Sequence, residues 1–263
     1  MKIGISTASL FPDKHSEEAA KIIKSLGVDL IEIFLSTFYE YRPEFSKALA
    51  PEIEGVEVNS LHTMPLNFEP NIFNSTRRVR GDGYYWLDQV ARSAQLLKCH
   101  NYTFHGFVRP SGGRQNDDMG YIGDRIAEAH AFTAGYGVNL CLENTSAYAY
   151  NRPGFFKEVK SRCGDLYGVF DIKQARRSGY PYGMYLKDME GAIAYVHLSD
   201  VDENGRICLP GKGVYDFEKI LKELKDSGFD GNIMLEVYRG NYSDFAELKQ
   251  SVDFVNEIIY KIK

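Results

Sequence analysis

The chain has 263 residues, of which 44% are apolar and 13% aromatic. This composition can fill a large core, which excludes an intrinsically disordered chain. The length suits one (β/α)8 barrel and also two ordinary domains. The net charge of −5 argues against a nucleic-acid-binding surface, so we expect no nucleic-acid partner.

Residues 1–11 alternate β-branched and polar side chains without a long apolar run. This favours a first strand over a signal peptide. No run of the sequence approaches the roughly 18 apolar residues of a membrane span, which predicts no membrane partner. The four cysteines form no CxxC pair, as is typical of reduced thiols in a cytoplasmic protein; they are Cys99, Cys141, Cys163 and Cys208. Cys208 follows a strand near the expected site, where a bystander thiol and a soft metal ligand are the two interpretations.

Eight strand-like runs alternate with helical segments from end to end. Most are apolar on both faces, which indicates parallel strands covered by helices. The strands are expected at 2–8, 30–36, 56–64, 102–108, 139–146, 167–172, 193–200 and 232–238.

Amphipathic segments fill most of the connections. The first predicts a helix with Ser16 as N-cap and Gly27 as C-cap. The second connection, 39–55, contains two prolines and is the least helical. The remaining helices are expected within 80–99, 122–137, 216–231 and 243–262.

Strict alternation predicts parallel strands joined by right-handed crossovers. No linker or shift in composition marks a boundary, so we expect one TIM barrel over 1–263. A doubly wound open sheet is the main alternative. Its first strand would lead into a Gly-rich phosphate turn, and residues 6–14 contain no glycine.

Ionisable side chains end the last four strands: Glu143, Asp171, His197 and Glu236. In a closed barrel the strands' carboxyl ends form one face, and neighbouring strands lie about 4.8 Å apart. Three carboxylates and one imidazole can therefore converge on one divalent cation. This ligand set suits Mn²⁺, Mg²⁺ or Co²⁺, and Zn²⁺ also fits.

Each of these residues also has a structural interpretation. Asp171 could cap the helix that follows it, and His197 could be a hydrogen-bonded filler. Glu143 could pair with Arg109 or Arg177, and Glu236 with Arg239. Four unpaired buried ionisable groups would cost several kcal/mol each, and a shared cation removes that cost.

Other polar residues are expected near the same face. His62 and His105 end the third and fourth strands. Glu32 lies inside the second strand and is expected to bond backbone or a neighbouring loop. In the loop after the seventh strand, Arg206 and Lys212 could meet a phosphate or carboxylate, whereas its PGKG segment suits ordinary turn chemistry.

Four segments, LENTS, FDIKQA, VHLSD with LPGKG, and MLEVY, together resemble the xylose isomerase-like TIM barrels. This family includes tagatose and psicose 3-epimerases, hydroxypyruvate isomerase and inosose dehydratase, and endonuclease IV shares its fold. The resemblance covers essentially the whole chain. It implies that Glu143 and Glu236 are both metal ligands and proton carriers, and that Asp171 and His197 are ligands only.

The sequence departs from the family pattern at two places. Gln174 stands where relatives have a histidine, and an amide binds hydroxyls but carries no proton. Endonuclease IV also uses an Asp-x-His pair after its seventh strand, which RICLPGKG lacks, although His62 and His105 match its other imidazoles. The resemblance further implies that Arg206 contacts substrate hydroxyls.

The sequence therefore predicts a metal-dependent isomerase or epimerase of a small sugar or polyol ketone. A proton is removed beside a metal-bound carbonyl, and the reaction passes through an enediolate. His62, His105, Gln174 and Arg206 are expected to bind the substrate, and family members are often homodimers or homotetramers. The alternatives are a keto-inositol dehydratase, an endonuclease IV-like phosphodiesterase, which the missing ligands disfavour, and a silent sugar-binding barrel.

Overall fold

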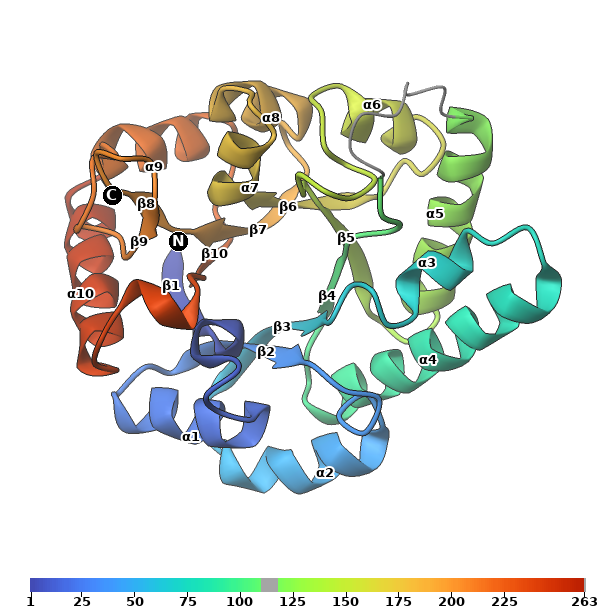
Figure 1. Cartoon of the computed structure of the whole chain (residues 1–263), viewed down its shortest axis with the longest axis horizontal. Coiled ribbons are helices and arrows are strands. Elements are labelled where there is room, and N and C mark those ends of the chain that lie inside the picture. The colour runs from blue at the N-terminus through green and yellow to red at the C-terminus, as the bar shows by residue number, and fades with distance from the viewer. Residues whose placement is uncertain (110–117, 263) are drawn as a thin grey trace.

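In the computed structural model, which describes residues 1–109 and 118–262, eight parallel strands close into one barrel (Figure 1). Their order around it is β1, β10, β7, β6, β5, β4, β3, β2, which confirms the TIM barrel. The strands are β1 (Lys2–Ser6), β2 (Leu30–Leu35), β3 (Glu57–Thr63), β4 (Asn101–Phe104), β5 (Asn139–Glu143), β6 (Tyr167–Asp171), β7 (Ile193–Leu198) and β10 (Asn232–Leu235).

Helices surround the barrel on the outside (Figure 1). After β7 the chain also forms a short antiparallel hairpin of β8 (Asp200–Val201) and β9 (Ile207–Cys208). The helices are η1 (Thr7–Leu10), α1 (Ser16–Ser25), α2 (Pro43–Glu52), α3 (Glu69–Ile72), α4 (Arg77–Leu96), α5 (Met119–Ala134), α6 (Phe155–Lys160), α7 (Ile172–Arg177), α8 (Tyr182–Asp188), α9 (Phe217–Asp226), η2 (Arg239–Asn241) and α10 (Ala246–Lys261).

Two details differ from the sequence-based expectations. The second connection does form a helix, α2, because Pro43 stands in its first turn, where a missing N–H costs nothing. The N-cap of α1 is His15, and Ser16 instead donates its hydroxyl to the Phe34 carbonyl of β2. Gly27 takes φ +75° just beyond the helix, as a C-terminal glycine should.

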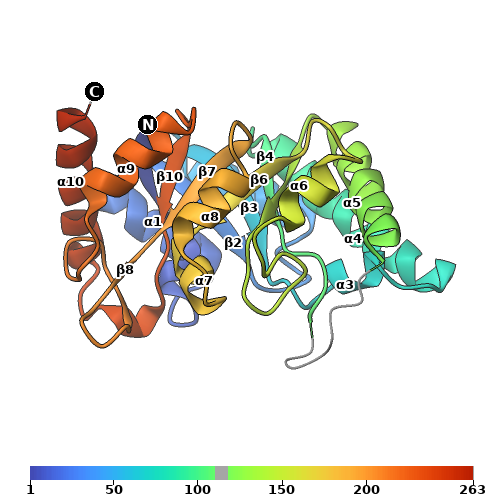
Figure 2. The ribbon, with the colours of Figure 1, turned by 90° about the horizontal axis from the view of Figure 1, so that it is seen from above.

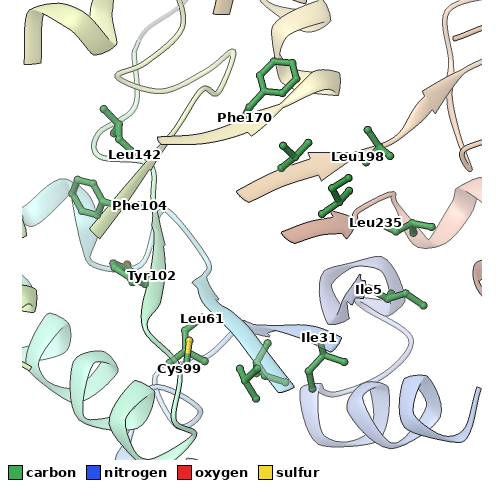
Figure 3. Close-up of a cluster of buried hydrophobic side chains, with 14 of the residues drawn as sticks. Ile5, Ile31, Leu61, Cys99, Tyr102, Phe104, Leu142, Phe170, Leu198 and Leu235 are labelled. Atoms are coloured by element: carbon green, nitrogen blue, oxygen red, sulfur yellow. The ribbon is translucent and has the colours of Figure 1, made fainter. Parts of the chain in front are cut away.

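Alternation along each strand separates an outer from an inner set of side chains. The outer set packs against the helices and forms the main core. In Figure 3, Ile5, Phe104 and Phe170 point away from the barrel centre. Because the strand period is two, the residues next to these point inward.

The inner set forms two layers. Five buried side chains fill the interior on the amino-terminal side: Leu30, Cys141, Val169, Tyr195 and Met234. On four of these strands the residue two positions further along points to the same inner face. These residues are Glu143, Asp171, His197 and Glu236. In Figure 2 the carboxyl ends of the strands lie at the lower edge, together with α3 and α7, and the chain termini lie at the opposite edge. The alternation that fills the barrel therefore also carries the ionisable groups to its carboxyl face.

Within residues 1–109 and 118–262, no helix is both long and apolar enough to cross a membrane.

Candidate active site

The four strand-end residues come together at the carboxyl face. Each offers one ligand atom, and these atoms lie within 4.8 Å of one another. The Nδ1 of His197 is 2.8 Å from a Glu143 oxygen, 2.9 Å from a Glu236 oxygen and 3.9 Å from an Asp171 oxygen. Backbone pairing sets part of this geometry, because Asp171 stands beside His197 in the register of β6 and β7.

These distances fit a divalent cation. Ligands on an octahedral ion with bonds of about 2.1 Å lie roughly 3 Å apart when adjacent and roughly 4.2 Å apart when opposite. The contacts of His197 at 2.8, 2.9 and 3.9 Å fall close to this range. Glu143, Asp171, His197 and Glu236 are therefore the residues that would hold such an ion.

Glu32 fixes the ring of His197. Its Oε2 is 3.1 Å from Nε2 of His197, so the ring can donate there and leave Nδ1 to face the carboxylates. Glu32 is fully buried and also accepts from Ser6, Ser60 and Thr103. Its partners are side chains of other strands of the barrel, and not the backbone or loop expected from the sequence. A carboxylate that orients a ligand histidine is a common feature of metal sites.

His62 and His105 lie beside this group and are joined to each other. Their Nε2 atoms are 3.0 Å apart, and the Nε2 of His105 is also 3.0 Å from Glu143. On the other side of the His105 ring, Nδ1 is 3.3 Å from Glu69. Burial opposes protonation of His105, but Glu69 and Glu143 outweigh it and raise its pKa to about 10. His62, His105 and Glu143 also offer three ligand atoms within 4.8 Å.

Lys173 places an ammonium group among the carboxylates. Its Nζ donates to Asp171 and, at 2.9 Å, to Glu236. Burial raises the pKa of Asp171 to about 6; Glu143 and Glu236 add to the rise, and Lys173 opposes it. For Glu236 the balance is reversed: Lys173 and His197 overcome the effect of burial and hold its pKa well below the ordinary value.

A pocket of about 190 Å³ opens above these groups, smaller than the cavities of about 300–1,000 Å³ that take drug-sized ligands. Glu143 and Glu236 line it, whereas Asp171 and His197 lie beneath its floor with 0% and 1% of their surface exposed. The other polar side chains of its wall are His62, His105, Thr145, Lys173 and Gln174.

Gln174 and Thr145 are the neutral polar groups of this wall. The Gln174 side-chain oxygen accepts from the backbone N–H and hydroxyl of Ser146 at 3.2 and 3.0 Å, which leaves its NH₂ for the pocket. Thr145 is buried, and among the described residues its hydroxyl has no hydrogen-bond partner. Both groups can meet a hydroxyl of a bound molecule.

Of the purely structural roles considered for the site residues, the structure shows the helix cap at Asp171 but not the arginine pairs of Glu143 and Glu236. Asp171 does cap α7, through Oδ1 and the N–H of Gln174, while its Oδ2 remains in the cluster. Glu143 pairs with histidines instead of Arg109 or Arg177. Arg239 pairs with Asp13 and not with Glu236.

The structure does not bring Arg206 to the pocket. It stands on the exposed β8–β9 hairpin, where its guanidinium pairs with Asp202 at 3.0 Å. The two stand four positions apart on one turn, and the hairpin places the side chain in solvent, 76% exposed. The following loop is organised by buried Asp200, which accepts from the N–H groups of Gly211 and Gly213. PGKG therefore serves turn chemistry, as expected.

Three functional candidates were missed by sequence reasoning: the pocket hydroxyl of Thr145, and Glu69 and Lys173. Glu69 lies in the four-residue helix α3. This helix is too short to show a helical repeat of apolar residues, and Glu69 does not end a predicted strand, so no sequence signal marks it. Lys173 follows Asp171 by two residues, next to buried Ile172. The one available signal was a lysine in the first turn of α7, where helices favour acidic residues.

A family model for the xylose isomerase-like TIM barrel matches residues 20–258. The chain belongs to this family. Among the curated relatives of this barrel is the uncharacterized protein MJ1311 of Methanocaldococcus jannaschii, which is 23% identical over 98% of this chain and 91% of its own length.

Three solved barrels show the same fold. A D-tagatose 3-epimerase-like protein superposes with a TM-score of 0.81 at 19% identity, covering 100% of this chain and 98% of its own. The IOLI protein with a bound zinc atom gives 0.78 at 18%, covering 99% of both chains. The probable 3-DHS dehydratase AsbF of Bacillus anthracis gives 0.72 at 14%, covering 97% of this chain and 99% of its own.

Proposed function

We propose that this protein is a divalent-metal-dependent isomerase or epimerase of a small sugar or polyol ketone. The observation that carries the proposal is the division of the four clustered residues. Glu143 and Glu236 line the pocket, whereas Asp171 and His197 are buried beneath it. Two carboxylates can therefore touch a substrate, and the other two groups can act only as ligands. The epimerase-like neighbour agrees with this chemistry.

A divalent cation held by these four residues would polarise a carbonyl and stabilise negative charge on oxygen. As a ligand of the cation Glu236 would be ionised, and it lines the pocket, so it can accept the proton next to the carbonyl. Glu143 is held in its ionised form by His105 and His197, so it must first take a proton before it can return one to the substrate. Protonated His105, 3.0 Å away, can supply that proton. Return of the proton to the neighbouring carbon gives an isomer, and return to the same carbon from the other side gives an epimer.

Neutral groups of the pocket would select the substrate. The Gln174 amide and the Thr145 hydroxyl, which has no hydrogen-bond partner among the described residues, can bind hydroxyl groups. His62 and His105 line the same wall, where a substrate hydroxyl would share ring nitrogens that now contact each other, Glu32, Glu69 and Glu143. The aromatic side chains of Phe11, Phe34, Tyr148 and Tyr238 also line the pocket. A small pocket with these groups suits a polyhydroxylated ketone better than an apolar ligand.

The test is a screen of ketopentoses, ketohexoses and keto-inositols with Mn²⁺ in D₂O, read by NMR and mass spectrometry. We expect deuterium at the carbon next to the carbonyl and no loss of mass as water. Absence of exchange across the panel, in protein shown to bind Mn²⁺, would count against the proposal.

A keto-inositol dehydratase is the second candidate, favoured by the structural likeness to a probable dehydratase. It begins with the same deprotonation and then expels a hydroxyl. In the same screen, its product is lighter by one water. Binding of a sugar without deuterium incorporation or loss of water would indicate a sugar-binding barrel that has no catalytic activity.

A further inference from the structure

Lys173 bridges two carboxylates that come from different strands. Its side chain is 3% exposed. The Nζ donates to Oδ2 of Asp171 at the end of β6 and, at 2.9 Å, to Oε2 of Glu236 after β10. These strands are separated in the barrel by β7. The ammonium therefore ties together two sides of the cluster across His197.

The same oxygen atoms face His197. Its Nδ1 lies 3.9 Å from Oδ2 of Asp171 and 2.9 Å from Oε2 of Glu236. The other oxygen of Asp171 accepts from the backbone N–H of Gln174 at 2.9 Å. An ion bound at His197 would therefore have to share or displace the oxygen atoms that Lys173 now holds.

We propose that Lys173 is the resident counter-ion of this site, which holds Asp171 and Glu236 together without metal and weakens the binding of a divalent cation. The inference rests on the metal site proposed above. A divalent ion and an ammonium that share oxygen atoms repel each other strongly in a buried environment. The ammonium also offsets part of the cost of burying the two carboxylates, so a metal ion has less of that cost left to remove.

The surroundings allow the ammonium to move without leaving the site. Lys173 lines the pocket wall, and its Nζ is 5.9 Å from the ring centroid of Tyr238. An ammonium released from one carboxylate can stay over this aromatic face. Each carboxylate oxygen also has a second lone pair, so partial sharing with an ion is possible.

The experiment is calorimetric titration of MnCl₂ into the full chain and K173M at pH 7, together with thermal melts. We expect K173M to bind Mn²⁺ about tenfold more tightly or better, because a repelling charge next to the ion is gone. Without metal it should melt below the wild type, and Mn²⁺ should raise its Tm more. K173R, which keeps the charge, should stay near the wild type.

Arg177 supplies the matched control. Its guanidinium packs on the same Tyr238 ring, at 5.1 Å, but is exposed and bonds the Tyr238 hydroxyl instead of a carboxylate. R177Q should therefore leave Mn²⁺ affinity within about twofold, because an exposed charge is screened by solvent. If K173M does not fold, K173Q, which can still donate to Asp171, takes its place.

The outcomes separate the two proposals. Weaker or unchanged Mn²⁺ binding in K173M overturns the role of Lys173 and leaves the metal site intact. H197A tests the site itself and should lose Mn²⁺ binding. If H197A binds as the wild type does, or if no variant binds Mn²⁺, the metal site falls and the counter-ion proposal falls with it. Binding seen only in K173M supports the proposal.

Discussion

Glu236 lies between the two cations of the site, the Lys173 ammonium at 2.9 Å and the His197 ring at 2.9 Å. Both favour its charged form, although only 9% of the residue is exposed. Both contacts make this carboxylate a weaker base, and what suits it to proton transfer is its place in the pocket wall, within reach of a bound substrate.

The first prediction concerns this carboxylate. Glu236→Gln keeps an oxygen for a metal ion but removes the proton acceptor, so turnover and deuterium exchange should fall about 10³-fold. Exchange into the ketose found by the screen is the measurement, with Mn²⁺ content checked in the same sample. Unchanged exchange with the metal retained would remove the two-glutamate mechanism.

Gln174 gives a contrasting prediction, since its amide has no accessible pKa. Gln174→Ala removes one substrate contact, so KM should rise about tenfold, with kcat lowered only as far as orientation suffers. Steady-state kinetics on the same ketose measures both. A change in stability alone, with KM unaltered, would mean that the side chain serves only to anchor Ser146.

At the scale of elements, the short helix α3 positions the end of β4. Its fully buried Glu69 accepts from the backbone N–H groups of His105 and Gly106 at 2.8 and 2.9 Å and from the Tyr102 hydroxyl at 2.6 Å. One carboxylate thus fixes both the backbone and the ring of His105. A helix of four residues is too short to be stable by itself, so α3 is stabilised by these hydrogen bonds of Glu69.

Glu69→Gln should therefore destabilise the protein by about 3 kcal/mol, because it leaves buried His105 with only one of its two carboxylate partners, Glu143. The measurement is urea unfolding as a function of pH. The pKa of His105 is raised to about 10 from 6.5, so its pairing stabilises the fold fully below pH 6.5 and is lost as pH rises through about 10. The wild type should lose stability across this window and the variant less.

An exposed pair provides the control for this experiment. Glu218 and Lys222 form a solvent-exposed contact on α9. Glu218→Gln should show no measurable change in unfolding and no altered pH dependence. An equal loss of stability in both variants would mean that removal of any negative charge causes it. The bonds from Glu69 to the end of β4 would then not be responsible.

At the scale of the whole molecule, eight strands deliver charge to one face. Five buried carboxylates lie there, from Glu32, Glu69, Glu143, Asp171 and Glu236. The counter-charges are Lys173 and the histidine rings between them. The barrel can bury so many acids because it also supplies these partners, and a bound cation would add to them.

The fourth prediction follows from Asp171, whose pKa is raised to about 6 from 3.8. Because of this raised pKa, the folded protein takes up a proton on Asp171 as pH falls through about 6. A carboxylate must be ionised to bind a metal ion, so the proton and the ion compete for Asp171. Protonation of this carboxyl should therefore reduce the stabilisation by Mn²⁺ as pH falls below 6, by about 1.4 kcal/mol per pH unit. Thermal melts with and without Mn²⁺ at pH 7 and pH 5 measure this, and equal shifts would contradict the assignment.

The sequence alone determined the barrel and the four strand-end groups. The starts of the strands were predicted within one residue, because apolar runs and helical segments alternate from end to end. Period two along β5, β6 and β7 then fixes Glu143, Asp171 and His197 on the inner face, whatever the loops do. These features depend on local pattern, which a sequence displays directly.

Only the tertiary structure decided what surrounds these groups. Lys173 reaches Glu236 across 63 positions, and Glu69 reaches His105 across 36. No local period encodes such contacts, because they depend on how far a side chain extends and which strands the closed barrel sets side by side. Arg206 shows the converse: its position in the sequence suggested a substrate contact, and the hairpin that carries it places its side chain in solvent.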